Sequence, residues 1–215
     1  FCDDVPDFDY HCNLICLIKY LGYEYETIPF TPLFEHLNVE PSPICNEIVK
    51  TVAFCRQLKT KTYIFNWKGN ENNPHELKNR RMGLENARPL FEMKNTNWII
   101  VTKELTSKEN KLLDCFDNVK YYGNLLDVNQ TYIDTVSIVQ NVDGVISTDT
   151  SLLHLSANLN IKTYALLTLG CDWRWTRNKP TTIWYPKIKL FRQKGLGDWS
   201  SVVLELIDEL KTNKV

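Results

Sequence analysis

The residues best suited to chemistry lie where a short apolar run ends in Thr148-Asp149-Thr150-Ser151. Apolar residues then recur at helical spacing around His154. The pattern predicts a buried strand that turns directly into a helix, with Thr150 or Ser151 as the N-cap. Free backbone N–H groups at the start of a helix attract anions, so the turn is suited to a phosphate or pyrophosphate. Because His154 lies one helical turn beyond Thr150, both can face the same ligand.

The same turn has a second interpretation that the residues alone leave open. It can be an ordinary strand–helix junction in which Asp149 caps the helix and His154 is a surface histidine with satisfied hydrogen bonds.

A second polar segment, residues 66–81, follows a predicted strand. Gly69 would allow the backbone to approach a ligand closely, and arginine is a bidentate partner for phosphate. The candidate phosphate-binding residues of this loop are Lys68, Gly69, Asn70, His75 and Arg81, with Arg80 as a further source of charge. Solvated surface charge is the alternative for Lys68 and Arg80.

A third candidate segment, Asp172-Trp173-Arg174-Trp175, interleaves aromatic and ionic side chains. The indoles could stack on a nucleobase while Arg174 reaches a phosphate or carboxylate. In the alternative, which we favour for the indoles, they pack the loop onto Trp184 and Tyr185, and Arg174 pairs with Asp172.

These loops need a framework, and the hydrophobic pattern supplies one from Lys61 onward. Strands are predicted at 62–67, 98–102, 119–122, 144–148, 163–168 and 187–191, and helices at 85–94, 106–117, 132–141, 151–159 and 198–211. Helices at 9–21 and 44–58 and an extended stretch at 23–30 precede them. Alternating strands and helices imply an α/β fold, a Rossmann-like parallel sheet with helices on both faces and an additional N-terminal helical segment. The loops 66–81, 148–154 and 169–186 then share the carboxyl edge of the sheet, where ligands bind.

Composition limits the classes of function. The 25 basic and 26 acidic side chains nearly cancel, so no basic surface for nucleic acid is expected. A hydrophobic fraction of 43% supports a packed core, and no apolar run is long enough to span a bilayer. The first residues carry neither a signal peptide nor an initiator Met, so a piece of something longer is expected.

The seven cysteines match no paired zinc pattern. His11, Cys12 and Cys16 form the only tight cluster, and their apolar neighbours favour free thiols on a buried amphipathic helix over a metal site. Reduced thiols suit a cytoplasmic location. Asp7-Phe8-Asp9 has the Asp-x-Asp spacing of a metal-binding signature, but its position before a predicted helix indicates coincidence, so no metal site is predicted.

A set of short motifs occurs here in the same order as in one known family. They are Phe8-Asp9-Tyr10-His11-Cys12, Tyr25-Glu26-Thr27-Ile28-Pro29, Ile146-Ser147-Thr148-Asp149-Thr150, His154-Leu155, Asp172-Trp173-Arg174-Trp175, Trp184-Tyr185-Pro186 and Leu190-Phe191-Arg192-Gln193. The chain resembles the glycosyltransferase domain similar to ADP-heptose heptosyltransferases (glycosyltransferase family nine) that ends many bacterial tetratricopeptide-repeat proteins. The resemblance covers nearly the whole chain, and it is the combination of motifs that is specific.

The resemblance implies a two-domain GT-B architecture, of which this chain holds mainly the second half. Residues 1–58 would be a helical segment and linker remaining from the acceptor-binding domain, and residues 59–215 the nucleotide-sugar-binding domain. The family's catalytic base is an acidic residue early in the first domain, and no counterpart can be assigned here. In the family, an Asp matching Asp149 is suited to sugar hydroxyls. Met82 stands where Ser is usual, which would remove a hydroxyl contact.

The implied function is transfer of a glycosyl group from a nucleoside diphosphate sugar to an unknown acceptor, with no cofactor or metal and with inversion. The expected partners are the nucleotide sugar and an acceptor domain or repeat array on the same or another chain. The predicted final helix has an apolar face that would also favour a homo-oligomer. The alternatives are a non-catalytic nucleotide-binding module, for which the absent acceptor domain argues, and an interaction domain whose site has decayed.

Overall fold

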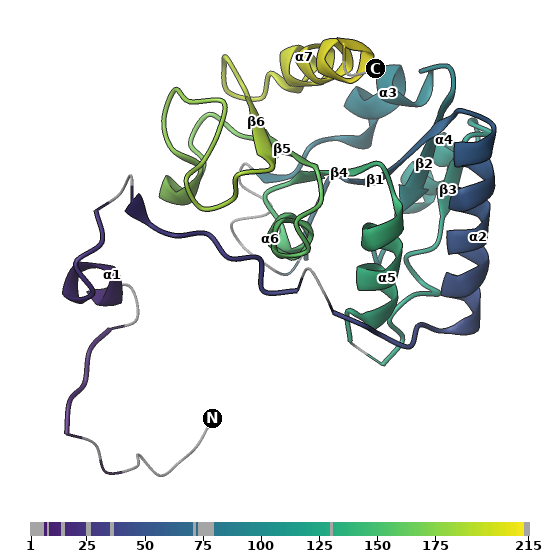
Figure 1. Ribbon diagram of the computed structural model, residues 1–215. Helices are drawn as coiled ribbons and strands as arrows, with labels where there is room; N and C mark the ends of the chain where they lie inside the picture. Colours follow the sequence, from purple (N-terminus) through teal and green to yellow (C-terminus); the bar gives the residue numbers. More distant parts are fainter. Residues whose placement is uncertain are drawn as a thin grey trace.

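The computed structural model describes residues 7, 9–13, 16–24, 27–34, 37–70, 72, 80–129 and 131–212 (Figure 1). A single six-stranded parallel sheet forms its centre, in the order β3-β2-β1-β4-β5-β6. The strands are β1 (Lys61–Asn66), β2 (Thr96–Ile100), β3 (Val119–Tyr121), β4 (Gly144–Thr148), β5 (Thr163–Leu167) and β6 (Ile188–Arg192). This order is typical of the Rossmann fold, and it reverses between β1 and β4. The predicted α/β Rossmann-like sheet is therefore confirmed.

The strands form because their apolar runs are buried on both faces of the sheet. Phe65 and Trp98 belong to a core that includes residues of α3 (Arg88–Phe91) and α7 (Trp199–Thr212). Ile64 and Val145 belong to a second core with α2 (Pro43–Gln57) and α5 (Ile133–Asn141). Neighbouring residues of a strand thus serve opposite cores, as the twofold period of a strand requires. Asn66, the last residue of β1, pairs in register with Ser147 of β4 and so places the ends of these two strands together.

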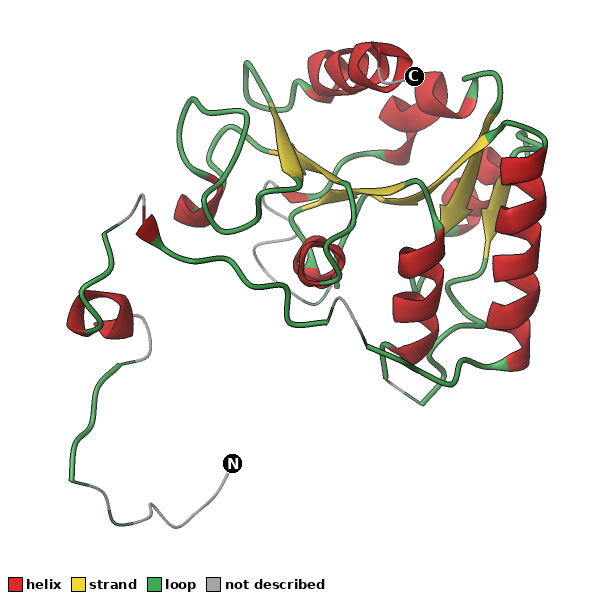
Figure 2. Ribbon diagram, viewed as in Figure 1, coloured by secondary structure: helices red, strands yellow, loops and turns green. Residues whose placement is uncertain are grey.

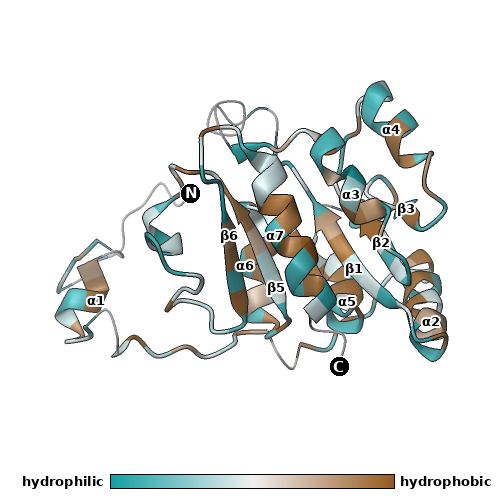
Figure 3. Cartoon of the chain, turned by 90° about the horizontal axis from the view of Figure 1, so that it is seen from above, coloured by the Kyte–Doolittle hydropathy of each residue, from teal (hydrophilic) through white to brown (hydrophobic). Residues whose placement is uncertain are grey.

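Helices cover both faces of the sheet (Figures 1 and 2). The elements on one face are η4 (Leu84–Ala87), α3 (Arg88–Phe91), α4 (Ser107–Leu113) and α7 (Trp199–Thr212), and those on the other are α2 (Pro43–Gln57), α5 (Ile133–Asn141) and α6 (Ser151–Asn158). Helix α4 begins with a capping box, in which Thr106 and Glu109 accept hydrogen bonds from each other's backbone N–H groups. Hydrophobic and hydrophilic residues alternate around α7 (Figure 3). Its apolar side chains are buried in the core of this chain, so this face is not the exposed surface expected to favour a homo-oligomer.

The predicted helix over 9–21 is only partly present. Among its described residues, α1 (Leu17–Tyr20) is an α-helix, and residues 9–13 are not helical. No residue of α1 is buried, and Cys12 and Cys16 are exposed rather than buried. An amphipathic pattern without a surface to pack against does not hold a short helix in water, because isolated helices of this length are marginal. The described residues of 23–30 contain no strand.

Helix α2 shares a core with the sheet, although the predicted division places it with the N-terminal segment. Cys45, Ile48 and Val52 of α2 are buried in the same core as Ile64 of β1. The segment before it is also attached, since Phe34 N–H donates to the Asn158 carbonyl at 2.9 Å. The division at residue 58 stays a prediction. Within the described residues, no helix is both long and apolar enough to cross a membrane.

Candidate functional site

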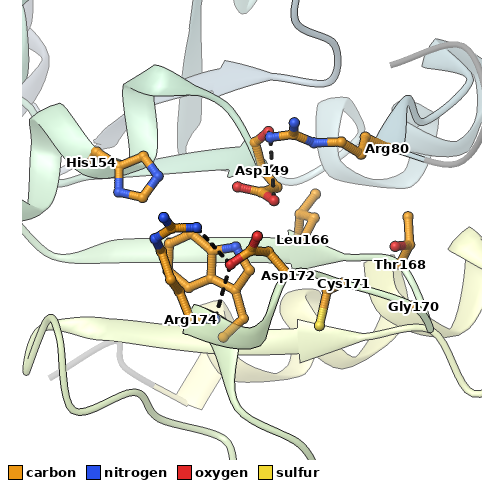
Figure 4. A pocket seen from close by; sticks show the side chains of 10 residues that line it. Arg80, Asp149, His154, Leu166, Thr168, Gly170, Cys171, Asp172 and Arg174 are labelled. Atoms are coloured by element: carbon orange, nitrogen blue, oxygen red, sulfur yellow. Dashed lines mark hydrogen bonds and ion pairs between the residues drawn. The ribbon is translucent and has the colours of Figure 1, made fainter. Parts of the chain in front are cut away.

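Two neighbouring cavities open at the carboxyl edge of the sheet. The switch-point cavity, of about 750 Å³, lies where the strand order reverses. Its lining includes Asn66, Lys68, Gly69, Asn70, Val101, Thr102, Lys103, Glu104, Gly123, Leu126, Asp127, Val128, Tyr132, Thr150, Ser151 and Leu152. The arginine–aspartate cavity, of about 450 Å³, is lined by Arg80, Asp149, His154, Leu166, Thr168, Gly170, Cys171, Asp172, Arg174 and Trp175 (Figure 4). Both volumes fall in the range of small-molecule sites.

A buried polar network holds the ends of β1, β2 and β4 together beneath the switch-point cavity. The Asn66 amide donates to the hydroxyls of Ser147 and Thr150, each at 3.3 Å. The Thr102 hydroxyl donates to the Asn66 amide oxygen at 2.7 Å, and the Ser147 and Thr150 hydroxyls lie 2.9 Å apart. Asn66 thereby connects three strand ends, and each contact is buried or partly buried. The network fixes the backbone from which α6 begins.

The first turn of α6 faces the switch-point cavity with its backbone donors uncapped. Thr150 occupies the N-cap position, but its side chain makes no capping hydrogen bond, because the hydroxyl contacts Asn66 and Ser147 instead. The first N–H groups of a helix lack partners within the helix. Among the described residues, no side chain accepts a hydrogen bond from these N–H groups. Ser151 and Leu152, the first two residues of the helix, line the cavity. The predicted side-chain cap is therefore wrong, while the predicted open helix terminus at a cleft is present.

The Lys68 ammonium lies in a buried ion pair and is not a free surface charge. Its Nζ is 2.9 Å from Glu109 Oε2, and the Trp67 indole donates to Glu109 Oε1 at 2.9 Å. Burial alone would raise the pKa of Glu109, but hydrogen bonds from Thr106, Lys68 and Trp67 outweigh burial and lower the pKa to about 2. Lys68 is among the residues that line the switch-point cavity, but its side chain is only 2% exposed and its ammonium is paired with Glu109.

The other residues predicted in this loop have different outcomes. Gly69 and Asn70 line the switch-point cavity, as expected of a ligand-binding loop. Arg81 lines neither cavity, and its guanidinium lies 3.6 Å from Glu109. His75 lies outside the described residues. Met82 is fully buried in the core with α3 and α7 and lines neither cavity, so its side chain serves packing.

Arg80 and Asp149 form one wall of the arginine–aspartate cavity (Figure 4). Arg80 Nη2 is 3.2 Å from Asp149 Oδ2 and also donates to the Asp149 carbonyl. This pair joins the loop after β1 to the junction between β4 and α6. Thr148, predicted as a phosphate contact, is fully buried and lines neither cavity.

His154 lines the arginine–aspartate cavity, whereas Thr150 lines the other one. The two side chains thus line neighbouring cavities, and that both face one ligand stays a prediction. The His154 ring stacks on Trp175 at 5.4 Å, and its Nδ1 is 2.9 Å from the Tyr185 hydroxyl. Burial lowers the pKa of His154, and the nearby Asp149 carboxylate offsets this in part. The imidazole is thus held near neutral pH in its uncharged form, suited to donate or accept one hydrogen bond.

The loop 172–175 adopts the second of its two predicted arrangements. Arg174 Nη1 is 2.9 Å from Asp172 Oδ1, and its guanidinium lies over the Trp173 ring at 4.8 Å. Trp173 packs edge-to-face on Trp184 with ring centroids 5.7 Å apart, and lines neither cavity. Trp175 is buried against His154 and Tyr185. Asp172 and Arg174 thus line the arginine–aspartate cavity as an ion pair. Both indoles pack against neighbouring side chains, and Trp175 also lines this cavity.

Sequence reasoning missed several residues of the switch-point cavity. Asn66, Thr102, Glu104, Gly123 and Tyr132 all line it. A usable signal existed for the first four, since each ends or closely follows a predicted strand and such positions converge at one edge. Tyr132 precedes α5 and had no such signal. Within the described part of the chain, no three His, Cys, Asp or Glu side chains come together as metal ligands would.

No protein-family model and no curated protein matches this sequence. Solved structures match it by shape. A glycosyl transferase family 9 protein from Veillonella parvula DSM 2008 gives a TM-score of 0.51 at 10% identity, over 83% of this chain and 53% of that chain. E. coli heptosyltransferase WaaC with ADP gives 0.48 at 13% identity, over 92% and 53% respectively. E. coli ADP-heptose lps heptosyltransferase II gives 0.48 at 16% identity, over 82% and 54%.

The chain thus spans about half the length of each of these proteins. The likeness to the V. parvula structure shows a shared fold, and at this level of identity it shows the fold alone. The predicted resemblance to family nine is confirmed at the level of the fold. The tetratricopeptide-repeat context stays a prediction.

Proposed function

We propose that this chain is the donor-binding part of a glycosyltransferase and that it binds a nucleoside diphosphate sugar at the carboxyl edge of its sheet. The observation that carries the proposal is the open N-terminus of α6 at the switch-point cavity. Uncapped backbone donors and the helix dipole favour an anion that accepts hydrogen bonds from these amides. Ligands of Rossmann-like sheets bind at the point where the strand order reverses. The V. parvula protein that shares the fold bears the name of a glycosyl transferase, which supports this class of reaction.

In this proposal the two cavities at the edge of the sheet bind different parts of the nucleotide sugar. In the proposal the nucleoside occupies the larger switch-point cavity, with Thr102 and Glu104 near the end of β2 where sheets of this type hold ribose hydroxyls. The diphosphate lies at the backbone amides of Ser151 and Leu152, in the cavity that the residue Lys68 also lines. The glycosyl group extends toward Asp149, His154 and Asp172, whose oxygen and nitrogen atoms can hydrogen-bond sugar hydroxyls.

The proposed reaction is a metal-independent, inverting transfer. The leaving diphosphate gains negative charge as the glycosidic bond breaks, and fixed backbone donors at a helix terminus stabilise such charge without reorganisation. Activation of the acceptor hydroxyl needs a base, which the proposal assigns to an acceptor domain or repeat array on the same or another chain. Self-association through surfaces that such a partner would cover is part of the same proposal.

A non-catalytic nucleotide-binding module is the second candidate, and one feature favours it. Asp149 and Asp172, the carboxylates that line the arginine–aspartate cavity, are both paired with arginine. Each of these carboxylates would have to leave its arginine partner before it could accept a proton from an acceptor hydroxyl. The module would bind nucleotide and neither transfer nor hydrolyse the sugar.

Calorimetry with ADP, GDP and UDP and their sugars tests binding, using Ser151→Asp and Ser151→Asn as a matched pair. Ser151 is exposed at the first position of α6, where Asp is favourable to the helix itself. We expect the Asp variant to keep the fold and to lose at least tenfold in affinity, because its carboxylate repels the diphosphate, while the Asn variant stays within a few-fold. Absence of binding to every nucleotide would overturn the proposal, and sugar transfer or hydrolysis by the isolated chain would exclude the second candidate.

A further inference from the structure

Exposed apolar side chains gather at the switch-point cavity, where a purely polar anion site has no need of them. Val128 is 72% exposed and Tyr132 is 54% exposed, and both line the cavity. The buried Leu126 and the half-buried Val101 line it as well. The helix terminus lies among the same lining residues, so an apolar surface and an anion-binding surface share one cavity.

Tyr132 is held in place at this surface by its hydroxyl. The Tyr132 hydroxyl lies 3.0 Å from the hydroxyl of Ser151, the first residue of α6. Tyr132 is itself the N-cap residue of α5, so the contact joins the starts of two helices. The ring therefore lies beside the start of α6, with more than half of the side chain open to solvent.

The ionic groups of the cavity do not select a strongly charged occupant for the apolar part. The lining contains two basic residues, Lys68 and Lys103, and two acidic ones, Glu104 and Asp127, so their charges balance. Lys68 is already paired with Glu109. A flat, neutral ring with polar edges fits an exposed aromatic face with hydroxyl and carboxylate groups nearby, because aromatic stacking is tolerant of the ring's identity.

We propose that the Tyr132 ring is the surface on which the nucleotide's base stacks, and that the hydrogen bond to Ser151 sets the ring at a fixed distance from the diphosphate-binding amides. This rests on the proposed function and deepens it, because it names the residue that recognises the base. Val101, Leu126 and Val128 provide the remaining apolar contact. Tyr132 is a binding residue for the donor and takes no part in proton transfer.

The test compares nucleoside diphosphates with inorganic pyrophosphate, a ligand that has the anion and no base. Calorimetry is run on the wild-type chain, Tyr132→Ala, Tyr132→Leu and Tyr132→Phe. Tyr20→Ala is the matched control, since Tyr20 is 72% exposed on α1 and lines neither cavity. Circular dichroism and thermal unfolding establish that each variant is folded. The Leu variant keeps an apolar side chain of similar volume, so it separates stacking from simple filling of space.

We expect Tyr132→Ala and Tyr132→Leu to weaken nucleoside diphosphate binding roughly 10- to 100-fold and to leave pyrophosphate binding unchanged. Tyr132→Phe keeps the ring and should stay within about fivefold of wild type, having lost one hydroxyl contact. Tyr20→Ala should bind like wild type.

Three outcomes would overturn the inference while leaving the proposed function intact. They are unchanged nucleotide binding in Tyr132→Ala, nucleotide binding by Tyr132→Leu equal to wild type, and an equal loss for pyrophosphate and nucleotide. The last would mean that Tyr132 only supports the start of α6. Failure of the wild-type chain to bind any nucleoside diphosphate or pyrophosphate would instead overturn the proposed function itself.

Discussion

At the scale of single residues, the two cavities differ in how their polar groups are satisfied. Asp149 and Asp172 are paired with arginines, and His154 is in contact with Tyr185. The switch-point cavity instead combines the uncapped start of α6 with the partnered Asn66 and Lys68. A ligand entering the arginine–aspartate cavity must compete with existing ion pairs. A ligand entering the switch-point cavity meets backbone donors that no described side chain uses.

Asn66 gives a residue-scale prediction because it connects three strand ends. Asn66→Ala leaves the Thr102 and Ser147 hydroxyls without this partner, and should lower the free energy of unfolding by about 1–3 kcal/mol. Nucleotide affinity should fall with it, since α6 begins at the same network. Urea denaturation and calorimetry measure the two effects. Stability equal to wild type would show that the network is not coupled to the fold.

His154 gives a pH-dependent prediction. Because burial lowers its pKa in the folded chain, the unfolded chain binds the proton more readily and stability rises with pH through that range. The stability that neutral His154 provides should be complete above its unfolded pKa, near 6.5, and should be lost as pH falls below it. His154→Gln should therefore lose less of its unfolding temperature than wild type between pH 7.5 and about pH 5. Parallel losses in the two proteins would contradict this environment for His154.

At the scale of elements, a close approach of two loops shapes the switch-point cavity. Gly123, just after β3, lies against the loop after β2, and a Cβ at this position would come within 1.9 Å of the Thr102 carbonyl oxygen. No side chain fits there without moving backbone.

Gly123→Ala should therefore lower the free energy of unfolding by about 1–3 kcal/mol and weaken nucleotide binding, because the ends of β2 and β3 must separate. Gly170→Ala is the matched control, since a Cβ there meets nothing within 4 Å. Chemical denaturation of both variants gives the comparison. Equal stabilities would show that the loops separate at no cost.

The elements also show what could be predicted from the sequence. The strand at 144–148 and the helix after it were predictable because the apolar run, the polar turn and the second apolar run are all local signals. The helix at 9–21 failed because periodicity indicates an apolar face but not whether a surface exists to cover it. The partner of Lys68 was equally hidden, since Glu109 is a capping residue 41 positions away in the chain. Which cavity each side of α6 faces depends on the assembled sheet.

At the scale of the whole molecule, the buried Glu109 carboxylate makes the stability of the fold depend on pH in acid. Glu109 has a folded pKa of about 2, below its ordinary value of 4.5. Its contribution is complete above the unfolded pKa and is lost as pH falls from about 4.5 toward 2. Glu109→Gln should be less stable than wild type at pH 7, and the gap should narrow over that window. Unfolding followed by circular dichroism measures it, and a constant gap would contradict the account.

The Rossmann-like sheet supplies one edge with two cavities, and the chain spans about half the length of the proteins that share its shape. The proposal assigns the acceptor and its base to a partner beyond that edge. What the chain itself must do is hold a diphosphate at the start of α6.

An NMR titration tests that central claim most directly. Inorganic pyrophosphate and a nucleoside diphosphate are added in turn to the isotopically labelled chain, and the backbone amide signals of Ser151 and Leu152 are followed against those of His154 and Arg174. The account predicts that the first pair shifts with saturation for both ligands, and that additional signals around Tyr132 shift only with the nucleotide. Saturating shifts at His154 and Arg174 with none at Ser151 and Leu152, or no shifts at all, would contradict it.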